Sequence, residues 1–301
     1  MQRILFYTGY ASLSGFNYGS ELALVQLAKQ LQKDHDVFIL SFHAGPDHLG
    51  LKFLSFQEYL EQTFDVIIIS RYINFFLYFP VRALKCFIWI HDISFQAAFN
   101  GQMLPCNGRY YLENVMYEGV IVQTKWHKDT FEQIYPDAID RINIIGNGID
   151  TSLYKTPVEK IKYKFIYTSS PTRGLTYLLD IFPKIKEKYP DSLLYIYRDS
   201  AEFTQEQLTK IKELKEYVFY KGFANNVSLS REFLSSDVWL YPTNFNETYC
   251  ISALEAQAAG CLCLCTNMAA LSEVVSDRGL LLKSSYGSTE YTNEILNGLS
   301  R

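Results

Sequence analysis

The stretch "NFNETYCISALEAQAAGCLCLCT", Asn244 to Thr266, shows the building unit of the chain. A polar loop leads into an alanine-rich helix, then a glycine and an apolar strand, which is the alternation typical of an α/β sheet. Two acids stand out. Glu247 lies in the loop, and Glu255 lies inside the helix among alanines and leucine. Because carboxylates are seldom buried without a partner, Glu255 either reaches water or is held there to meet a ligand.

Strand and helix patterns alternate along the rest of the sequence. Near-continuous apolar strands predict parallel sheets covered on both faces. These strands are "RILFYTG", "DVFILSF", "FDVIIIS", "CFIWIHD", "GVIVQT", "YKFIYTSS", "SLLYIYRD", "VFYKGF", "DVWLYPT", "CLCLCT" and "GLLL". The first helix, "GSELALVQLAKQLQKD", is expected to turn Leu22, Val25, Leu27, Ala28 and Leu31 inward. The pattern restarts near residue 150. We therefore expect two Rossmann-like doubly wound domains, 1–150 and 151–301, facing one another across a ligand-binding cleft.

Composition narrows the function classes. The chain has 301 residues, a formal net charge of −4 and a pI of about 5.8, which argues against a nucleic-acid partner. The six cysteines form no disulfide-scaffold pattern, and Cys261, Cys263 and Cys265 read as small buried residues of a strand. The N-terminus lacks the parts of a signal peptide, and no apolar run is long enough to span a bilayer. These features predict a cytoplasmic protein.

The segment "PTNFNETYCISALEAQAAGCLCLCTNMAALSEVV" resembles the donor site of retaining glycosyltransferases with the GT-B architecture, especially family 4. That family carries two glutamates separated by seven residues, then an alanine-rich helix, a glycine and a strand. The resemblance implies that Glu255 binds a ribose and that Glu247 approaches the transferred sugar. It also implies donor contacts by Thr248, Tyr249 and Cys250. Independently, a helix starts here, where Thr248 or Ser252 could cap it and where unpaired amides attract phosphate.

Further donor contacts come from two other turns. In "YTSSPTRGL" a strand runs into a turn, and Arg173 stands directly before the glycine that opens a helix. The family holds the donor diphosphate with an arginine and a lysine at this turn. Arg173 matches one of them, whereas Ser169 or Ser170 fills the other position. The resemblance also places backbone contacts to the base at Gly222 and Phe223.

The N-terminal half supplies a loop and a histidine. "NYGSE", Asn17 to Glu21, follows the first strand, and Gly19 would let the backbone approach a phosphate. A plain tight turn is the alternative. "WIHDISF" puts His91 and Asp92 at the carboxyl end of a strand. The family has a histidine there that faces the transferred sugar. His127 is expected on a helix surface.

The resemblance predicts transfer of a sugar from a nucleotide-diphosphate donor to a glycan, lipid-linked or protein-linked acceptor with retention of configuration. Glu247 and His91 are the expected catalytic residues. We expect no cofactor and no metal, because no Asp-x-Asp metal cluster of the kind that GT-A glycosyltransferases use is apparent. Three rival functions are considered: a catalytically weak or inactive nucleotide-sugar-binding partner subunit, an epimerase and a phosphorylase. The last has no obvious lysine for pyridoxal phosphate.

Two further expectations concern the surroundings of the enzyme. Residues 71–85, "RYINFFLYFPVRALK", combine aromatic and basic side chains that could touch a membrane or a lipid-linked acceptor. A buried helix covering the sheet is the alternative. Relatives continue beyond the point where this sequence stops. This suggests either a truncated chain or a compact, oligomeric member of the family.

Overall fold

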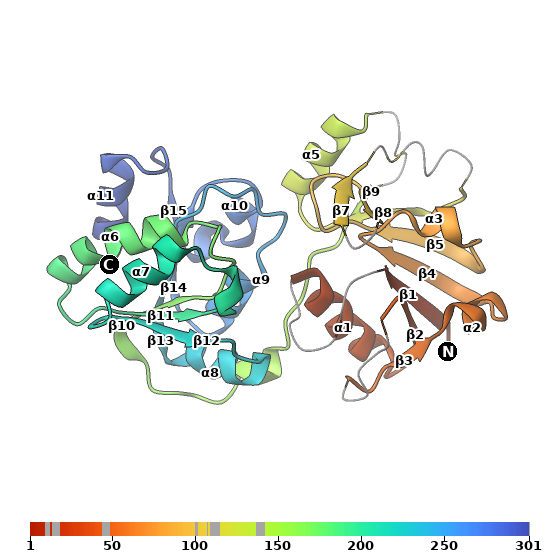
Figure 1. Ribbon diagram of the computed structural model, residues 1–301, viewed down its shortest axis with the longest axis horizontal. Helices are drawn as coiled ribbons and strands as arrows, with labels where there is room; N and C mark the ends of the chain where they lie inside the picture. The colour runs from red at the N-terminus through yellow and green to blue at the C-terminus, as the bar shows by residue number, and fades with distance from the viewer. Residues whose placement is uncertain are drawn as a thin grey trace. The chain divides into compact units, whose positions relative to one another are not determined.

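The computed structural model describes residues 1–9, 13, 19–43, 49–99, 102–106, 108, 115–136 and 142–300 (Figure 1). The chain divides into two compact units, Met1–Gly148 and Ile149–Arg301. Each unit is built on its own parallel sheet, so the prediction of two doubly wound α/β folds is confirmed.

The first unit contains a seven-stranded parallel sheet in the order β3-β2-β1-β4-β5-β8-β9. The order reverses between β1 and β4. The hairpin β6–β7 is antiparallel and stands apart from this sheet. The described elements are β1 (Arg3–Gly9), α1 (Gly19–Leu31), β2 (Asp36–Ser41), β3 (Lys52–Leu54), α2 (Phe56–Leu60), β4 (Phe64–Ser70), α3 (Phe75–Tyr78), β5 (Ala83–Trp89), β6 (Gln96–Phe99), β7 (Gln102–Pro105), β8 (Gly119–Val122), α5 (Lys125–Ile134) and β9 (Ile142–Ile144).

The second unit contains a six-stranded parallel sheet in the order β12-β11-β10-β13-β14-β15, which reverses between β10 and β13. Its elements are η2 (Thr151–Tyr154), β10 (Ile161–Tyr167), α6 (Leu175–Lys188), β11 (Leu193–Tyr197), η3 (Ser200–Glu202), α7 (Gln205–Glu213), β12 (Val218–Gly222), α8 (Asn226–Ser235), β13 (Ser236–Tyr241), α9 (Ile251–Ala258), β14 (Leu262–Thr266), α10 (Leu271–Val274), η4 (Ser276–Arg278), β15 (Leu280–Leu282) and α11 (Thr289–Gly298). In open α/β sheets ligands bind where the strand order reverses.

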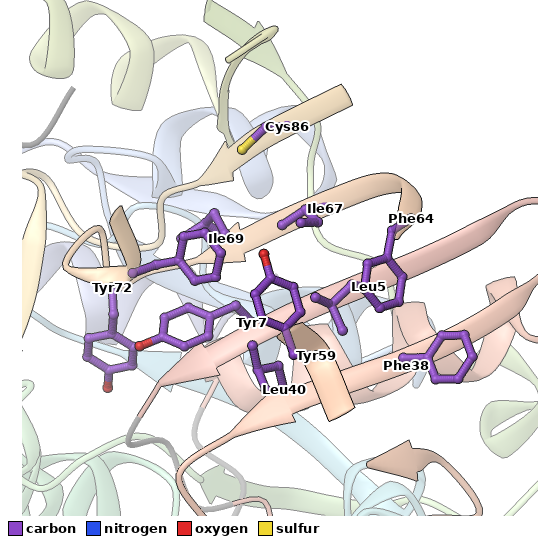
Figure 2. Close-up of a cluster of buried hydrophobic side chains, with 11 residues drawn as sticks. Leu5, Tyr7, Phe38, Leu40, Tyr59, Phe64, Ile67, Ile69, Tyr72 and Cys86 are labelled. Carbon is purple, nitrogen blue, oxygen red and sulfur yellow. The ribbon is translucent and has the colours of Figure 1, made fainter. Parts of the chain in front are cut away.

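An aromatic-rich core fixes the first sheet. Figure 2 shows side chains from β1, β2, β4 and α2 converging on one cluster, with Tyr7 and Leu5 from β1 at its centre. Residues 71–85 contribute to it, because Tyr72 and Phe75 are buried there. The alternative of one buried helix over this segment is wrong. It forms the one-turn α3, and β5 begins at Ala83. Among the described residues, no helix combines the length and apolarity needed to cross a bilayer.

The inward face of α1 differs from the expected one. The helix buries Glu21, Leu24, Val25 and Ala28, whereas Leu27 is exposed. Val25 and Ala28 are buried as expected, whereas the buried face also includes Leu24 and the carboxylate of Glu21 and leaves out Leu27. Sequence periodicity predicted that the most apolar residues of α1 would be buried. In the structure, an acidic residue of the first turn, Glu21, is buried as well.

The three cysteines around β14 pack as expected. Cys261, Cys263 and Cys265 are buried free thiols. Burial raises the pKa of each thiol, most of all that of Cys265. These thiols therefore stay protonated and act as small apolar residues.

Candidate functional site

The reversal point of the second sheet brings together two residues that are far apart in sequence. Arg173 lies in the loop between β10 and α6, and Glu247 lies in the loop between β13 and α9. Nη1 of Arg173 donates to both carboxylate oxygens of Glu247, at 3.0 and 3.2 Å. Burial lowers the pKa of Arg173, but the charge of Glu247 outweighs it and the net shift is upward. Arg173 is thus held as a cation beside the Glu247 carboxyl group.

The turn that carries Arg173 is built by close backbone approach. Gly174 has a φ of +96°, and a Cβ placed there would lie 1.9 Å from the carbonyl oxygen of Pro242. Only glycine lets the β10–α6 turn pass this close to the β13–α9 loop. The hydroxyl of buried Tyr167 donates to the carbonyl oxygens of Ser170 and Arg173, at 2.8 and 3.2 Å, and so supports the turn from below.

Glu247 is held on three sides. It is only 6% exposed, and its Oε1 accepts from the hydroxyl of buried Tyr241 at 2.6 Å. Its backbone oxygen accepts from the amide of Ala270 at 3.1 Å. The guanidinium of Arg173 lies 4.0 Å from the centre of the Phe245 ring, and this contact restricts the position of the arginine side chain. The acid is therefore preorganised before any ligand arrives.

The helix start beside Glu247 differs from the expected cap. The N-cap residue of α9 is Cys250, with a φ of +81° and no side-chain cap hydrogen bond. The expectation that Ser252 caps the helix is wrong, because its hydroxyl accepts from Thr168 at 3.1 Å instead. Thr248 is not the cap either. A first turn without a side-chain cap leaves backbone amides available for an anion.

Glu255 is the second acid, and it too is buried, at 8% exposure. Burial raises its pKa to about 7, although the hydroxyl of Tyr154 donates to Oε1 at 3.3 Å and acts in the opposite direction. Both glutamates therefore point into the protein rather than into bulk solvent. Glu255 holds its proton in a large fraction of molecules near neutral pH.

The remaining donor-side predictions lie at the same edge of the sheet. Gly222 ends β12 with a φ of +75°, and Phe223 follows it, half exposed. Strand β12 is separated from β10 by β11, so these two residues lie farther from Arg173. Arg198 follows β11, next to β10, and lies 2.9 Å from Glu202. Contact of Gly222 and Phe223 with the base stays a prediction.

The reversal point of the first sheet carries a second arginine, which the sequence analysis did not single out. Arg71 follows β4 directly and has a φ of +71°, a conformation that costs a non-glycine residue energy. Its guanidinium donates twice to Asp92, with Nε to Oδ2 at 2.7 Å and Nη2 to Oδ1 at 2.9 Å. A bidentate pair of this kind fixes both the side chain and the strained turn.

The start of α1 faces the same arginine. Glu21 lies 3.7 Å from Nη1 of Arg71, and Oε2 of Glu21 accepts from the hydroxyl of Ser20 at 2.8 Å. Gly19 is the first residue of the helix. Asn17 and Tyr18 of the predicted glycine loop lie outside the described residues. The feature nearest the predicted phosphate contact is thus a buried carboxylate.

Two histidines stand behind Asp92. His91 follows β5, with its ring centre 4.5 Å from that of Trp89, and burial together with the Arg71 charge lowers its pKa to about 3. The prediction that His127 lies on a helix surface is wrong. It is fully buried, its Nδ1 accepts from the amide of Gln123, and its Nε2–H donates to the backbone oxygen of Asp92 at 2.8 Å. Both rings are neutral at physiological pH.

Some of these residues carried sequence signals and others did not. Arg71 directly follows the apolar run "FDVIIIS", so a polar residue at a strand end pointed to it. Tyr241 and Tyr154 carry no sequence signal of a site. Only the fold shows that the Tyr241 hydroxyl donates to Glu247 and the Tyr154 hydroxyl to Glu255. The burial of His127 was not predictable from the sequence, because its neighbours along the chain are mostly polar.

Comparison with known proteins gives a family match in the second unit. Residues 154–297 match the family model described as "Glycosyl transferases group 1". Protein YtcC of Bacillus subtilis, provisionally named a glycosyltransferase, is 24% identical over 259 residues, which cover 76% of this chain and 62% of YtcC. The lipopolysaccharide 1,2-N-acetylglucosaminetransferase of Salmonella typhimurium is 24% identical over 60% of this chain and 53% of its own length. The chain thus spans less than two thirds of either relative.

Solved structures share the fold along nearly the whole chain. Anabaena HepE, crystallised with UDP-glucose, superimposes with a TM-score of 0.73 at 18% identity, covering 99% of this chain and 89% of HepE. The lipopolysaccharide glycosyltransferase WaaG gives 0.72 at 14% identity, covering 99% and 90%. The fold is therefore that of these glycosyltransferases, and the part of the second unit that holds Arg173, Glu247 and Glu255 lies within the match to the Glycosyl transferases group 1 model.

Proposed function

We propose that the chain transfers a sugar from a nucleotide-diphosphate donor, bound by the second unit, to a glycan or lipid-linked acceptor. The observation that carries the proposal is the pair formed by the partly exposed Arg173 and the buried Glu247, at a sheet reversal point inside the match to the Glycosyl transferases group 1 model. HepE was solved with UDP-glucose, which makes UDP-sugars the first donors to test.

The charges of the site suit the departure of a diphosphate. Cleavage of the sugar–phosphate bond leaves negative charge on the leaving group, and stabilising that charge is the main task of the protein. Arg173 and the amides at the start of α9 supply positive potential. We propose that the diphosphate competes with Glu247 for Arg173. The released carboxylate then faces the positively charged sugar, with retention of configuration and without a metal ion.

Glu255 and Tyr154 fit the pentose of the nucleotide. A carboxylate can accept from two neighbouring hydroxyl groups. Oε1 of Glu255 already accepts from one hydroxyl, that of Tyr154. Ribose binding favours the ionised acid, so donor binding is expected to release a proton near neutral pH. His91 stays neutral and would orient the sugar as a hydrogen-bonding group rather than as an acid.

One experiment tests the whole proposal. Thermal shift selects a donor from a panel of nucleotide sugars, because a ligand of the native state raises its melting temperature. Release of nucleoside diphosphate is then measured with and without acceptor. We expect Glu247→Gln to lower kcat about 100-fold or more. Glu213→Gln, on the exposed end of α7, is the matched control and should leave kcat unchanged.

Other outcomes favour the rival functions. Donor binding without turnover in the wild type would favour a nucleotide-sugar-binding partner subunit. The serines that replace a second basic residue near Arg173 are the observation behind that reading. Conversion of one nucleotide sugar into another would favour an epimerase.

Membrane contact through residues 71–85 is a separate part of the proposal. Leu77, Tyr78 and Leu84 are exposed large apolar residues of this segment, and Leu84 is 80% exposed. Arg82 and Lys85 lie beside them in sequence. Flotation with anionic liposomes should carry the wild type upward and leave a Leu77→Ser, Leu84→Ser variant behind. A wild type that stays at the bottom contradicts membrane contact.

A further inference from the structure

A second arginine, which the sequence did not single out, lies at the carboxyl edge of the second sheet. Arg198 follows β11 directly, and β11 pairs with β10, the strand that leads to Arg173. The registered pairs of these strands end at Tyr167 with Ile196. Two residues farther along, the strands reach Ser169 and Arg198 respectively. Because neighbouring strands lie about 4.8 Å apart, the backbone of Arg198 lies beside the start of the β10–α6 turn.

The charge of Arg198 acts on the same turn as that of Arg173. The hydroxyl of Tyr167 donates to the backbone oxygens of Ser170 and Arg173 in this turn. Burial raises the pKa of Tyr167 well above its ordinary value, and the positive charges of Arg173 and Arg198 both lower it. A charge has such an effect mainly on groups near it. Two guanidinium groups therefore lie around one hydroxyl, whereas the two serines of the turn bring no charge.

The side chain of Arg198 is held by a single acid at the end of β11. Its Nε lies 2.9 Å from Oε1 of Glu202, and the two side chains are 22% and 24% exposed. The Tyr220 hydroxyl donates to the backbone oxygen of Arg198 at 3.0 Å and fixes the main chain. Asp199, the next residue, accepts from the amide of Ala201 at 2.9 Å and caps η3. Glu202 is thus the acid that pairs with Arg198.

The Arg198–Glu202 pair can exchange its acid for a ligand. Ion pairs that water reaches contribute little to stability, so parting Arg198 from Glu202 costs little. An arginine binds a phosphate through two parallel charge-assisted hydrogen bonds, which are stronger than an ordinary hydrogen bond. Glu202 belongs to the short turn η3, where its carboxylate can turn to water once it is released.

The charge of a nucleotide diphosphate calls for more than one arginine. Each of its two phosphates is negative, and departure of the sugar adds further negative charge to the leaving group. Arg173 is itself paired with Glu247, so it balances only part of this charge. A second guanidinium on the neighbouring strand supplies the missing balance at the same edge of the sheet.

We infer that Arg198 binds the diphosphate of the nucleotide together with Arg173, and that Glu202 occupies the place of a phosphate until the ligand arrives. The inference rests on the proposed function, because it takes the donor diphosphate as the ligand. It predicts effects of opposite sign for the two members of the pair. Loss of Arg198 weakens diphosphate binding, whereas loss of Glu202 removes a competitor and strengthens it.

The test compares ligands that differ only in their phosphates. Ligand-observed NMR on the full chain, which also detects weak binding, is recorded with UDP, GDP, ADP and dTDP, and the tightest binder fixes the base. The nucleoside of that base is then measured as the probe without phosphate. We expect Arg198→Gln to weaken diphosphate binding roughly tenfold and nucleoside binding by less than about twofold. Arg198→Lys, which keeps the charge and loses the planar pair of donors, should lie between Arg198→Gln and the wild type.

Two further variants separate exchange from a purely structural ion pair. Glu202→Gln should tighten diphosphate binding about threefold, because the phosphate no longer competes with a carboxylate. A pair that only supports the fold would give Arg198→Gln and Glu202→Gln similar losses of stability in urea, with unchanged affinity. Arg231→Gln, at an exposed position on α8, is the matched control and should leave affinity unchanged.

Every other result overturns the inference. It fails if Arg198→Gln binds the diphosphate like the wild type, if it loses nucleoside binding to the same extent, or if Glu202→Gln does not tighten binding. Sugar transfer, measured on the same samples, keeps the two proposals apart. Diphosphate binding that depends on Arg198, in a protein that transfers no sugar, would contradict the transfer reaction and leave this inference standing. A wild type that binds none of the four diphosphates would contradict both.

Discussion

The two units present the same topology with different electrostatics at the point where strand order reverses. Each places one arginine and two acids there: Arg71 with Asp92 and Glu21 in the first unit, and Arg173 with Glu247 and Glu255 in the second. In the first unit one arginine contacts both acids. In the second it contacts only Glu247, and Glu255 stands apart with a tyrosine.

This difference separates two kinds of binding. An arginine engaged with two carboxylates has little positive charge to offer to an anion. An arginine with one acid partner beside an uncapped helix start can exchange that acid for a diphosphate. The comparison teaches that topology places both clusters, whereas the number of acids that contact each arginine sets the local charge.

The largest expected effect concerns the glycines that let the loops approach. Gly174→Ala puts a Cβ 1.9 Å from the backbone oxygen of Pro242 at a φ of +96°, and a backbone atom cannot move aside. We expect a loss of roughly 3 kcal/mol or more in the free energy of unfolding. Gly9→Ala in the first unit meets side-chain atoms, those of Tyr72 at 2.8 Å and the Tyr7 hydroxyl oxygen at 3.4 Å, and should lose about 1–2 kcal/mol.

Urea unfolding of both variants measures this contrast. Gly287→Ala is the control, because its φ is +79° but a Cβ there meets nothing within 4 Å, so it reports backbone strain alone at about 1 kcal/mol. Equal losses for Gly174→Ala and Gly287→Ala would show that the two loops of the second unit do not need this contact.

Removal of each arginine gives the second contrast. Arg71→Ala leaves two acids without their cation and keeps the strained backbone, so we expect a loss of roughly 2–4 kcal/mol in the free energy of unfolding. Arg173→Ala leaves Glu247 with its Tyr241 hydrogen bond, and Arg173 is partly exposed, so about 1 kcal/mol is expected.

Arg71→Gly separates charge from strain, since glycine accepts a φ of +71°. It should be more stable than Arg71→Ala by about 1 kcal/mol in the same unfolding assay. We expect the arginine cluster of the first unit to be the more tightly coupled one. A larger loss of unfolding free energy for Arg173→Ala than for Arg71→Ala would contradict this.

Much of this architecture was predictable from particular residues. The apolar strands indicated both sheets. In the second unit, the glycine before Cys261 marked the end of a helix, and the spacing of Glu247 and Glu255 indicated the predicted donor site. Three features were not predictable. The start of α9 at a left-handed Cys250, the burial of His127 and the acid on the buried face of α1 all follow from tertiary contacts that local pattern does not encode.

The third prediction uses pH, because the two units should respond with opposite sign. The folded pKa of Glu255 is about 7, above its ordinary 4.5, so stability falls as the pH rises from about 4.5 to about 7. His91 and His127 have folded pKa values of about 3 and 4, below the ordinary 6.5. The unfolded chain then binds more protons, and stability falls as the pH drops below about 6.5.

Segment-resolved hydrogen exchange reads the two units separately. Between pH 5 and 7, after correction for intrinsic exchange, protection of α9 should fall with rising pH and protection of α5 should increase. Glu255→Gln should abolish the first trend only, a change of up to about 3 kcal/mol across the full range. The same trend in both helices would contradict independent titration of the two clusters.

The smallest expected effect isolates the hydroxyl that partners Glu255. Tyr154→Phe removes the only donor to Oε1 found among the described residues, and that donor lowers the pKa of Glu255. The pKa should therefore rise further, which carboxyl-selective NMR can follow. If Tyr154 merely occupies the place of a ribose hydroxyl, nucleotide affinity above pH 8, where the acid is ionised, should stay within about threefold of the wild type. A tenfold or greater loss there would show that Tyr154 itself contacts the nucleotide. Tyr163→Phe, whose ring packs at a tilt against Tyr189, gives the baseline for removing a tyrosine hydroxyl.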